Sequence, residues 1–450
     1  MTSLVDLAIV ESRAAALLEA AKKAGAEQAD VIAARGLSQG IEIRNGALEE
    51  MDSSESDRMA LRVFCGHRTA IVSTSETGDT DFSTLAERAV ATAKAAPEDP
   101  YASLAAAGET GQTAVDLELV DPDFPTMDSL MDRAQAAEAA ALDVAGISKS
   151  GGASAGFSLA GVVLATSNGF HGQYMRSNHS LWATAIAGEG TGMERDYDFV
   201  RALHLADLDA PETIGRNAAE RAVKRQAPSK VETRTGTVVF EPRLASGLVS
   251  TVAQALNGAS VARGTSFLKD RMGEQIFKAG IRITDDPLRV RGLGSRPFDG
   301  EGVAANPLTL VENGCISSWV LDLASAAELG LKTTGHAGRG IGGPPSPSST
   351  NLTLLPGDET PEALIAGIDF GIYVTELIGR GGNTTTGDYS RGASGFLIEK
   401  GELKGPVAEI TVAGNLDDMF AQLTPANDLR YRMTTNAPTV AVDGLTIAGR

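Results

Sequence analysis

Apolar residues recur with helical spacing in several segments of the N-terminal half of the chain. Residues 4–24 show this spacing and end at Gly25, a residue that suits the C-cap of a helix. The same pattern recurs at residues 82–95, 127–144 and 212–225. We therefore predict four helices in this half of the chain.

Alternating apolar and polar residues between and after these helices predict antiparallel strands. Asn45-Gly46 and Asn168-Gly169 separate such runs, and both pairs favour tight hairpin turns because their residues tolerate a positive φ. The predicted strands are residues 31–34, 41–44, 59–64, 69–72, 154–166 and 172–187.

The remainder of the chain, from residue 230 onwards, is dense in glycine and in short β-type runs. It contains few helical patterns, which lie at residues 244–256, 325–329, 361–368 and 417–422. Residues 335–349 combine glycine, proline and serine, and this composition predicts a mobile loop.

These patterns predict an α+β protein with two or three domains. An N-terminal α+β region of antiparallel strands and helices precedes a larger β-rich C-terminal domain. We place an N-terminal α+β domain at residues 1–100, a middle α+β domain at 101–228 and the C-terminal domain at 229–450. Residues 98–125 are rich in Pro, Gly, Ala and Asp, as expected of an extended connector.

The charge and composition narrow the possible partners and the compartment. The formal net charge of -19 argues against nucleic acid and against a polybasic membrane contact. The first ten residues lack the basic segment of a signal peptide, and no apolar run approaches the roughly 20 residues that span a bilayer. Two cysteines are too few for a disulfide framework. We therefore expect a cytoplasmic, reduced protein.

No local motif predicts a metal or phosphate site. The five histidines have no spacing that would place two imidazoles on one helix face. They are His67, His171, His179, His204 and His336. Residues 338–343 fit the G-x-G-x-x-G pattern, but prolines follow where a dinucleotide site requires a helix. We expect no metal ligand and no dinucleotide in this chain.

Two residues could be mistaken for catalytic nucleophiles. Ser154 lies in a Gly-x-Ser-x-Gly pattern, but a strand-like run follows it where a nucleophile elbow requires a helix. Cys315 heads a short strand, and no cation lies nearby in sequence to activate its thiol. Both residues are more typical of structural positions, and we assign no catalytic residue.

Two polar segments rich in glycine suggest backbone-defined sites. Residues 381–396 place Asp388 and Arg391 among glycines and hydroxyls, and Arg391 could hold a carboxylate or a peptide carbonyl. Asp299 and Glu301 lie two positions apart, which allows acid–base chemistry, but a turn held by Asp299 is the more common arrangement.

Six short segments of the C-terminal half carry a family resemblance. They are Thr265–Leu268, Gly294–Gly302, Leu331–Gly335, Val374–Gly379, Thr386–Phe396 and Glu409–Leu416. Together these segments resemble the TldD/PmbA family, and specifically its TldE (PmbA) branch. The resemblance implies a cytoplasmic zinc metallopeptidase of two subunits that acts on unfolded peptides, including leader peptides of modified peptide antibiotics.

The chain departs from the family pattern where a zinc-binding motif would stand, and this departure indicates which subunit it resembles. In the TldD branch a helix bearing His-Glu-x-x-x-His holds the zinc, whereas the corresponding residues 244–256 contain neither His nor Glu. The resemblance therefore implies that zinc belongs to a TldD-like partner and that this chain holds extended peptide through backbone hydrogen bonds. The residues we expect to face the substrate are Asp388, Ser390, Arg391 and Asn415.

Two other functions remain open at this point. The chain could act as a homodimeric peptide-binding or scaffolding protein without hydrolytic activity. It could also be a hydrolase without metal that uses Cys315 or Ser154. Co-purification with a protein bearing His-Glu-x-x-x-His would favour the subunit of a metallopeptidase.

Overall fold

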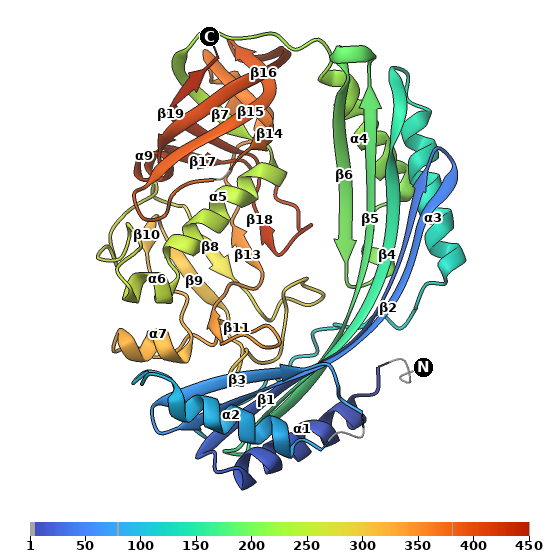
Figure 1. The fold of residues 1–450 in the computed structure, drawn as a ribbon. Coiled ribbons are helices and arrows are strands. Elements are labelled where there is room, and N and C mark those ends of the chain that lie inside the picture. The colour runs from blue at the N-terminus through green and yellow to red at the C-terminus, as the bar shows by residue number, and fades with distance from the viewer. Residues whose placement is uncertain (1–4, 79–80, 380, 450) are drawn as a thin grey trace.

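The computed structural model describes residues 5–78, 81–379 and 381–449. A long, strongly curved sheet forms one side of the molecule, and the C-terminal domain lies inside its curve (Figure 1). Helices alternate with antiparallel strands in the first half, and strands dominate the second, so the α+β prediction is confirmed.

The first sheet has six strands in the order β3-β2-β1-β4-β5-β6, all antiparallel. Asn45 (φ 53°) and Gly46 (φ 74°) form the predicted turn between β1 and β2. The strands are β1 (Gln28–Arg44), β2 (Ala47–Cys65), β3 (Arg68–Thr74), β4 (Ile147–Thr166), β5 (His171–Ala187) and β6 (Glu194–Ala202).

The prediction of separate short strands at residues 31–34, 41–44 and 59–64 is wrong. Residues 31–34 and 41–44 belong to β1, and residues 59–64 belong to β2. These two long strands pair along almost their whole length, from Gln28 to the hairpin turn, and no loop divides either of them. Residues 47–58 of β2 are almost all exposed and polar, so the apolar alternation that marks a half-buried strand is missing there.

All four helices of the N-terminal half cover one face of this sheet. Alternate residues of β1, such as Val31 and Ile41, point towards the helices and are buried among them. The helices are α1 (Leu7–Lys23), α2 (Ser83–Ala95), α3 (Met127–Leu142) and α4 (Pro211–Lys224), with short 3-10 turns at Gly190–Gly192 and Leu205–Asp207. The predicted helices are confirmed, although the predicted start at Leu4 lies outside the described residues.

The C-terminal domain contains a ring of five strands that closes on itself. The ring runs β16-β15-β14-β7-β19 and returns to β16. The short strand β17 (Leu423–Pro425) pairs with residues 440–442 of β19, whereas β16 pairs with residues 446–448. Its strands are β7 (Arg234–Phe240), β14 (Phe370–Ile378), β15 (Asp388–Glu399), β16 (Glu402–Asn415) and β19 (Val440–Ala448).

A second, five-stranded sheet of short strands and several helices complete this domain. The short strands are β8 (Ile283–Asp285), β9 (Leu308–Glu312), β10 (Cys315–Ile316), β13 (Leu352–Leu354) and β18 (Thr435–Asn436), and β11 (Ala337–Gly338) pairs with β12 (Ser346–Pro347). The helices are α5 (Pro242–Ala255), α6 (Gly258–Ala262), α7 (Leu323–Glu328), α8 (Pro361–Ala366) and α9 (Leu416–Gln422).

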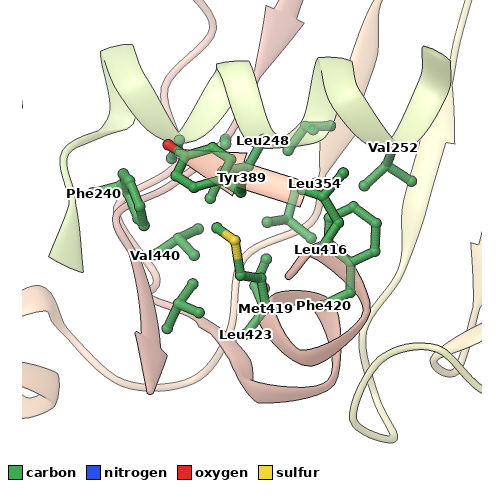
Figure 2. Close-up of a cluster of buried hydrophobic side chains, with 14 of the residues drawn as sticks. Phe240, Leu248, Val252, Leu354, Tyr389, Leu416, Met419, Phe420, Leu423 and Val440 are labelled. Carbon is green, nitrogen blue, oxygen red and sulfur yellow. The ribbon is translucent and has the colours of Figure 1, made fainter. Parts of the chain in front are cut away.

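The main core of this domain lies between the ring, α5 and α9. Leu248 and Val252 on α5 face Phe240 on β7 and Phe420 on α9, and Tyr389 of β15 lies among them (Figure 2). Burial raises the pKa of Tyr389 to about 12. The glycine-rich segment therefore contributes Tyr389 and Ala393 to the core.

The predicted domain boundaries stay predictions. Residues 98–125 form the irregular connection between α2 and α3, and the boundary near residue 228 falls between α4 and β7. Strands of the first and second predicted domains nevertheless share one sheet, since β1 pairs with β4 over most of its length.

The C-terminal domain reaches one end of the first sheet through the segment around Phe298. This side chain is buried against Ile32, Leu164 and their neighbours, and its ring lies 5.3 Å from that of Phe170. Gly302 (φ 81°) allows the close approach, because an added Cβ would lie 2.6 Å from the Phe170 ring. The segment Gly294–Gly302 therefore forms part of the contact between the C-terminal domain and the first sheet.

A buried ion cluster reinforces this contact. Asp30 and Arg62 are cross-strand partners on β1 and β2, with the Asp30 Oδ2 atom 2.8 Å from Arg62 Nε. Arg339 of the C-terminal domain inserts a fully buried side chain, whose Nη2 lies 2.7 Å from Asp30 Oδ1. Burial alone would raise the pKa of Asp30, but the two guanidinium groups outweigh it and hold this pKa below its ordinary value.

The prediction that residues 335–349 form a mobile loop is wrong. Besides Arg339, the segment buries His336, whose Nε2 atom lies 3.1 Å from Asp285 Oδ2 and whose Nδ1 atom donates a hydrogen bond to Thr334 O at 2.7 Å. The short β11–β12 pair holds the segment further. Composition alone could not indicate that one arginine and one histidine anchor a glycine-rich loop.

Asp299 holds a turn within this interface, as the sequence favoured. Its carboxylate accepts hydrogen bonds from the backbone N–H groups of Glu301, Val303 and Ala337. Glu301 in turn accepts a hydrogen bond from Leu323 N at the start of α7. Burial, helped by the nearby Asp299 charge, raises the pKa of Glu301 to about 8.

Two helical glycines provide a matched test of packing. An alanine Cβ at Gly215 on α4 would lie 1.9 Å from Ala137 O on α3, whereas nothing lies within 4 Å of a Cβ at Gly247 on α5. We expect Gly215→Ala to lower the free energy of unfolding by about 3 kcal/mol, through overpacking. Gly247→Ala should instead raise it by about 0.5–1 kcal/mol, because alanine has the higher helix propensity. Urea titrations would measure both, and equal effects would contradict the close α3–α4 packing.

The Glu301 carboxyl predicts a specific pH dependence of stability. Its folded-state pKa of about 8 lies above its ordinary value of 4.5, so the folded protein keeps a proton that the unfolded chain loses. Stability from this group is complete below about pH 4.5 and is lost as the pH rises to 8, by up to about 1.4 kcal/mol per pH unit. We expect Glu301→Gln to show a shallower loss between pH 5 and 8 than the unchanged protein. Urea midpoints across this range would show it.

The matched control for this experiment is Glu312→Gln, an exposed carboxylate on β9. It should reproduce the pH profile of the unchanged protein. A Glu301→Gln profile parallel to that of the control would show that Glu301 is ionised in the folded state.

Candidate functional site

The face of the first sheet opposite the helices is covered only in part. Near Phe298 it packs against the C-terminal domain, but farther along β4, β5 and β6 its residues border open space. Polar and aromatic side chains occupy this uncovered part. They include Ser158, Arg176, Asn178, Trp182, Thr184, Phe199 and Arg201.

Four cavities lie between this face and the C-terminal domain, and they share lining residues. Trp182 joins the cavities of about 290 and 600 Å³, and Met433 joins the latter to those of about 240 and 390 Å³. We call this connected space the interdomain cleft. Its walls are residues 375–377 of β14, the start of α5, and the segments 289–293 and 430–436.

Stacked aromatic rings form one part of the cleft floor. The Trp182 ring lies 4.4 Å from that of Tyr197 at an interplanar angle of 6°, and 5.3 Å from that of Phe199. Trp182 is 40% exposed although it sits in the middle of a sheet. An exposed, preorganised aromatic surface of this kind suits the side chains and backbone of a bound peptide.

Arginines occupy the outer edge of β6, where another strand would otherwise pair. Arg243 Nη1 donates to Tyr197 O at 2.7 Å, and Arg432 Nη1 donates to Phe199 O at 3.3 Å. Arg243 also pairs with Asp196. Burial lowers the pKa of Arg243, but the Glu241 and Asp196 carboxylates outweigh it and leave this pKa raised. These contacts hold α5 and the segment 430–436 against the sheet and close this edge to an incoming strand.

The sequence placed a candidate site in residues 388–391 and Asn415, and the structure brings these together. Asp388 is opposite Asn415 on β15 and β16, and it accepts a hydrogen bond from the Thr386 hydroxyl at 2.7 Å. Asn415 caps α9 by accepting from Asp417 N. Ser390 is exposed, and its neighbour Arg391 donates from Nη2 to Leu377 O at 3.3 Å.

One residue of this group, Arg391, contacts one end of the cleft. Leu377 lines the same cavity as Trp182, so Arg391 contacts the cleft wall through the Leu377 carbonyl. β14 pairs only with residues 392–399 of β15, so within the described chain no strand covers the second edge of residues 388–391. Whether the four residues contact a substrate stays a prediction.

The sequence overlooked the residues that line the rest of the cleft. Trp182 falls in a predicted strand and reads as an ordinary strand residue, whereas Phe199 lies in β6, which the sequence patterns did not predict. Arg201, Arg289 and Arg430 lie far apart in sequence. One signal was available: along residues 194–202 the positions facing the cleft are Arg195, Tyr197, Phe199 and Arg201, large side chains where a solvated strand would have small polar ones.

Helix α5, where the family pattern would place a zinc motif, has a donor set that does not fit zinc. The Ser246 and Thr251 hydroxyls donate to backbone carbonyls of their own helix, and Ser250 donates to Thr435. The helix carries no imidazole, thiol or carboxylate. We therefore assign no metal ion to helix α5.

Two of the histidines, His179 and His204, lie beside one carboxylate, and His171 lies elsewhere. His179 pairs with Asp121 at 3.0 Å and His204 lies near the same carboxylate at 3.9 Å, between the first sheet and the connector. Burial lowers the pKa of His179 despite that carboxylate. His171 pairs with Glu11 at the surface, and within the described residues no group of three or more His, Cys, Asp or Glu could hold a metal ion.

The remaining sequence motifs occupy structural positions. Ser154 lies in the middle of β4, so no strand–turn–helix elbow exists around it. Cys315 begins the two-residue strand β10 and is a free thiol. Residues 338–343 lead into β12, where a dinucleotide motif would lead into a helix.

No helix among the described residues is long and apolar enough to cross a membrane.

The chain matches three domain families along its length. Residues 29–93 match the PmbA/TldA metallopeptidase domain 1, residues 120–226 its central domain and residues 233–449 its C-terminal domain. Together they cover most of the described chain.

Individual proteins and a solved structure agree with this match. The metalloprotease PmbA of Escherichia coli O157:H7 is 34% identical over 98% of this chain and 96% of its own length. The metalloprotease PmbA homolog of Haemophilus influenzae is 34% identical over 96% of this chain and 94% of its own. The crystal structure of TldE from Thermococcus kodakarensis has the same fold, with a TM-score of 0.84 at 22% identity, covering 96% of this chain and 99% of that one.

Proposed function

Because the chain belongs to the PmbA/TldD metallopeptidase family, in its TldE (PmbA) branch, we propose that it is the peptide-holding subunit of a two-chain metallopeptidase. The zinc of this cytoplasmic enzyme belongs to a TldD-like partner. The substrates are unfolded peptides, among them leader peptides that are removed from their precursors.

One observation carries the proposal: helix α5 borders a long open cleft yet offers no group that could hold or activate a metal-bound water. The start of α5 lines the cleft through Pro242 and Arg243, so a substrate in the cleft would lie beside it. Metal-assisted hydrolysis needs imidazole, thiolate or carboxylate ligands, and this helix has none. Binding without chemistry is the role that this geometry supports.

The cleft supplies two kinds of contact for an extended peptide. The rings of Trp182, Tyr197 and Phe199 provide an apolar surface that accepts many side chains. Among the described residues, no strand pairs with the second edge of β15 before Gly392. The Asp388 carbonyl already accepts a hydrogen bond from Asn383 N, so residues 389–391 are the part that can pair with peptide backbone, a mode that needs little sequence specificity. In this proposal Asp388, Ser390, Arg391 and Asn415 face the bound peptide.

Reconstitution tests the division of labour between the two chains. We expect the purified chain to carry no stoichiometric zinc and to cleave no unfolded peptide by itself. Mixed with a TldD-like protein bearing His-Glu-x-x-x-His, it should form a complex that contains zinc and cleaves the peptide. Elemental analysis and a peptide-cleavage assay on each chain and on the mixture would measure this. Turnover or tightly bound zinc in the lone chain would overturn the proposal.

Peptide binding by an inactive mixture, without cleavage, would instead favour a stand-alone peptide-binding or scaffolding protein. A homodimer of this chain that binds peptide and forms no complex with the TldD-like protein would be the clearest form of that result.

Substitutions in the cleft test where the peptide lies. We expect Trp182→Ala, Asp388→Ala and Arg391→Ala each to raise the KM of the reconstituted pair by about tenfold with little change in kcat, because each removes a ground-state contact. Tyr101→Ala is the control, since Tyr101 is an exposed aromatic residue of the connector outside the cleft. An unchanged KM for Asp388→Ala and Arg391→Ala would remove those residues from the substrate site.

A further inference from the structure

The end of the cleft beside the last residues of β6 is rich in arginine. Five arginines and two aspartates line this cavity of about 390 Å³, which is an excess of positive charge in a chain whose formal net charge is -19. The arginines come from three distant segments: β6, residues 289–291 and residues 430–432. They are Arg201, Arg289, Arg291, Arg430 and Arg432.

Two of these arginines are already neutralised by carboxylates. Arg291 lies 3.2 Å from Asp207 and 2.7 Å from Glu118, and Arg432 lies 3.4 Å from Asp198 and also pairs with Asp209. Both aspartates that line the cavity are thereby used. The positive charges of Arg291 and Arg432 are therefore paired, and these pairs hold the walls of the cleft together.

The other three arginines have no carboxylate partner within the described chain. Arg289 stacks over the Tyr431 ring, with its guanidinium carbon 3.2 Å from the ring centroid. Arg201 and Arg430 are exposed, and no hydrogen bond or ion pair engages either side chain. Stacking fixes the Arg289 plane while leaving its N–H groups for a ligand.

We infer that this cavity is a binding site for a carboxylate group of the peptide substrate. The inference rests on the proposed peptide-holding function. Guanidinium groups bind carboxylates through paired N–H donors, and several of them on converging segments would hold one tightly. The α-carboxylate of a peptide C-terminus and an Asp or Glu side chain share this chemistry.

The position of the cavity gives the site a consequence for substrate choice. Arg201 also lines the neighbouring cavity over the sheet, which contains Trp182, so the arginine site continues directly into the aromatic floor. A peptide stacked on Trp182 and Phe199 would reach the arginines with a residue farther along the chain. Peptides with a carboxylate at that spacing are therefore selected over neutral ones.

Four fluorescent peptides of one length would test the inference by anisotropy. The first has a free C-terminus and no acidic side chain, and the second is its C-terminal amide. The third is an amide with Asp and Glu residues inside, and the fourth is the amide with Asn and Gln in their place. We expect at least one carboxylate-bearing peptide to bind about tenfold more tightly than its neutral counterpart, less so at high salt. The pair that discriminates identifies the source of the carboxylate.

The variants Arg201→Gln and Arg430→Gln, alone and combined, connect this preference to the cavity. Both side chains are exposed, so the fold should tolerate the changes, which circular dichroism would check. The combined variant should lose the tenfold preference and keep its affinity for the neutral peptides. Arg88→Gln, an equal loss of charge on the exposed side of α2, should keep the preference.

The outcomes separate this inference from the function on which it rests. Equal affinity for charged and neutral peptides, or a preference that survives the combined variant, would overturn the carboxylate site, even if the reconstituted pair cleaves peptide. Failure of every peptide to bind, together with no cleavage by the pair, would overturn the proposed function itself.

Discussion

The structure depends on the buried contact of Arg339 with Asp30, which also pairs with Arg62. This ion cluster, with Phe298 beside it, fixes the C-terminal domain at one end of the curved sheet. Charges buried so completely are costly unless each is paired, and removing one partner commonly costs about 3–5 kcal/mol. The cluster therefore permits one docking geometry between the two halves of the chain and resists others.

A second set of arginines holds the halves together at the other end. Arg243 pairs with Asp196 and Arg432 pairs with Asp198 along the free edge of β6, and Arg225, which follows α4, pairs with Glu376 of β14. Because the domains meet at two ends, the middle of the sheet face stays uncovered, and the interdomain cleft lies there. The same contacts prevent β6 from pairing with a strand of another chain.

An acidic protein thus contains a cleft with a basic end. The net charge of -19 describes the whole chain and argues against a general affinity for nucleic acid, but it averages over local differences. Three arginines that have no carboxylate partner among the residues described by the structure gather where segments from β6 and two loops converge. A local excess of this kind is invisible in composition, since it exists only after folding.

The sequence indicated some of the segments near the candidate site, but not where they lie in the fold. The glycine-rich segment 381–396 pointed to a backbone-defined site. In the structure its Arg391 contacts the cleft wall at Leu377 O, Tyr389 enters the core and Gly395 approaches the backbone of β14. The segment Gly294–Gly302 looked like a site for acid–base chemistry or a turn. It is a turn, and its function is to join the two halves.

The sequence by itself determined the α+β class, the four N-terminal helices, the hairpin turn at Asn45-Gly46 and the absence of zinc-type ligands from α5, because each follows from local periodicity or residue type. Only the tertiary structure decided that β1 and β2 are continuous, that Arg339 anchors a loop of mobile composition, and that Trp182 and the arginines share one cleft. These features come from contacts between residues far apart in the chain, and no local pattern encodes which distant segments will meet.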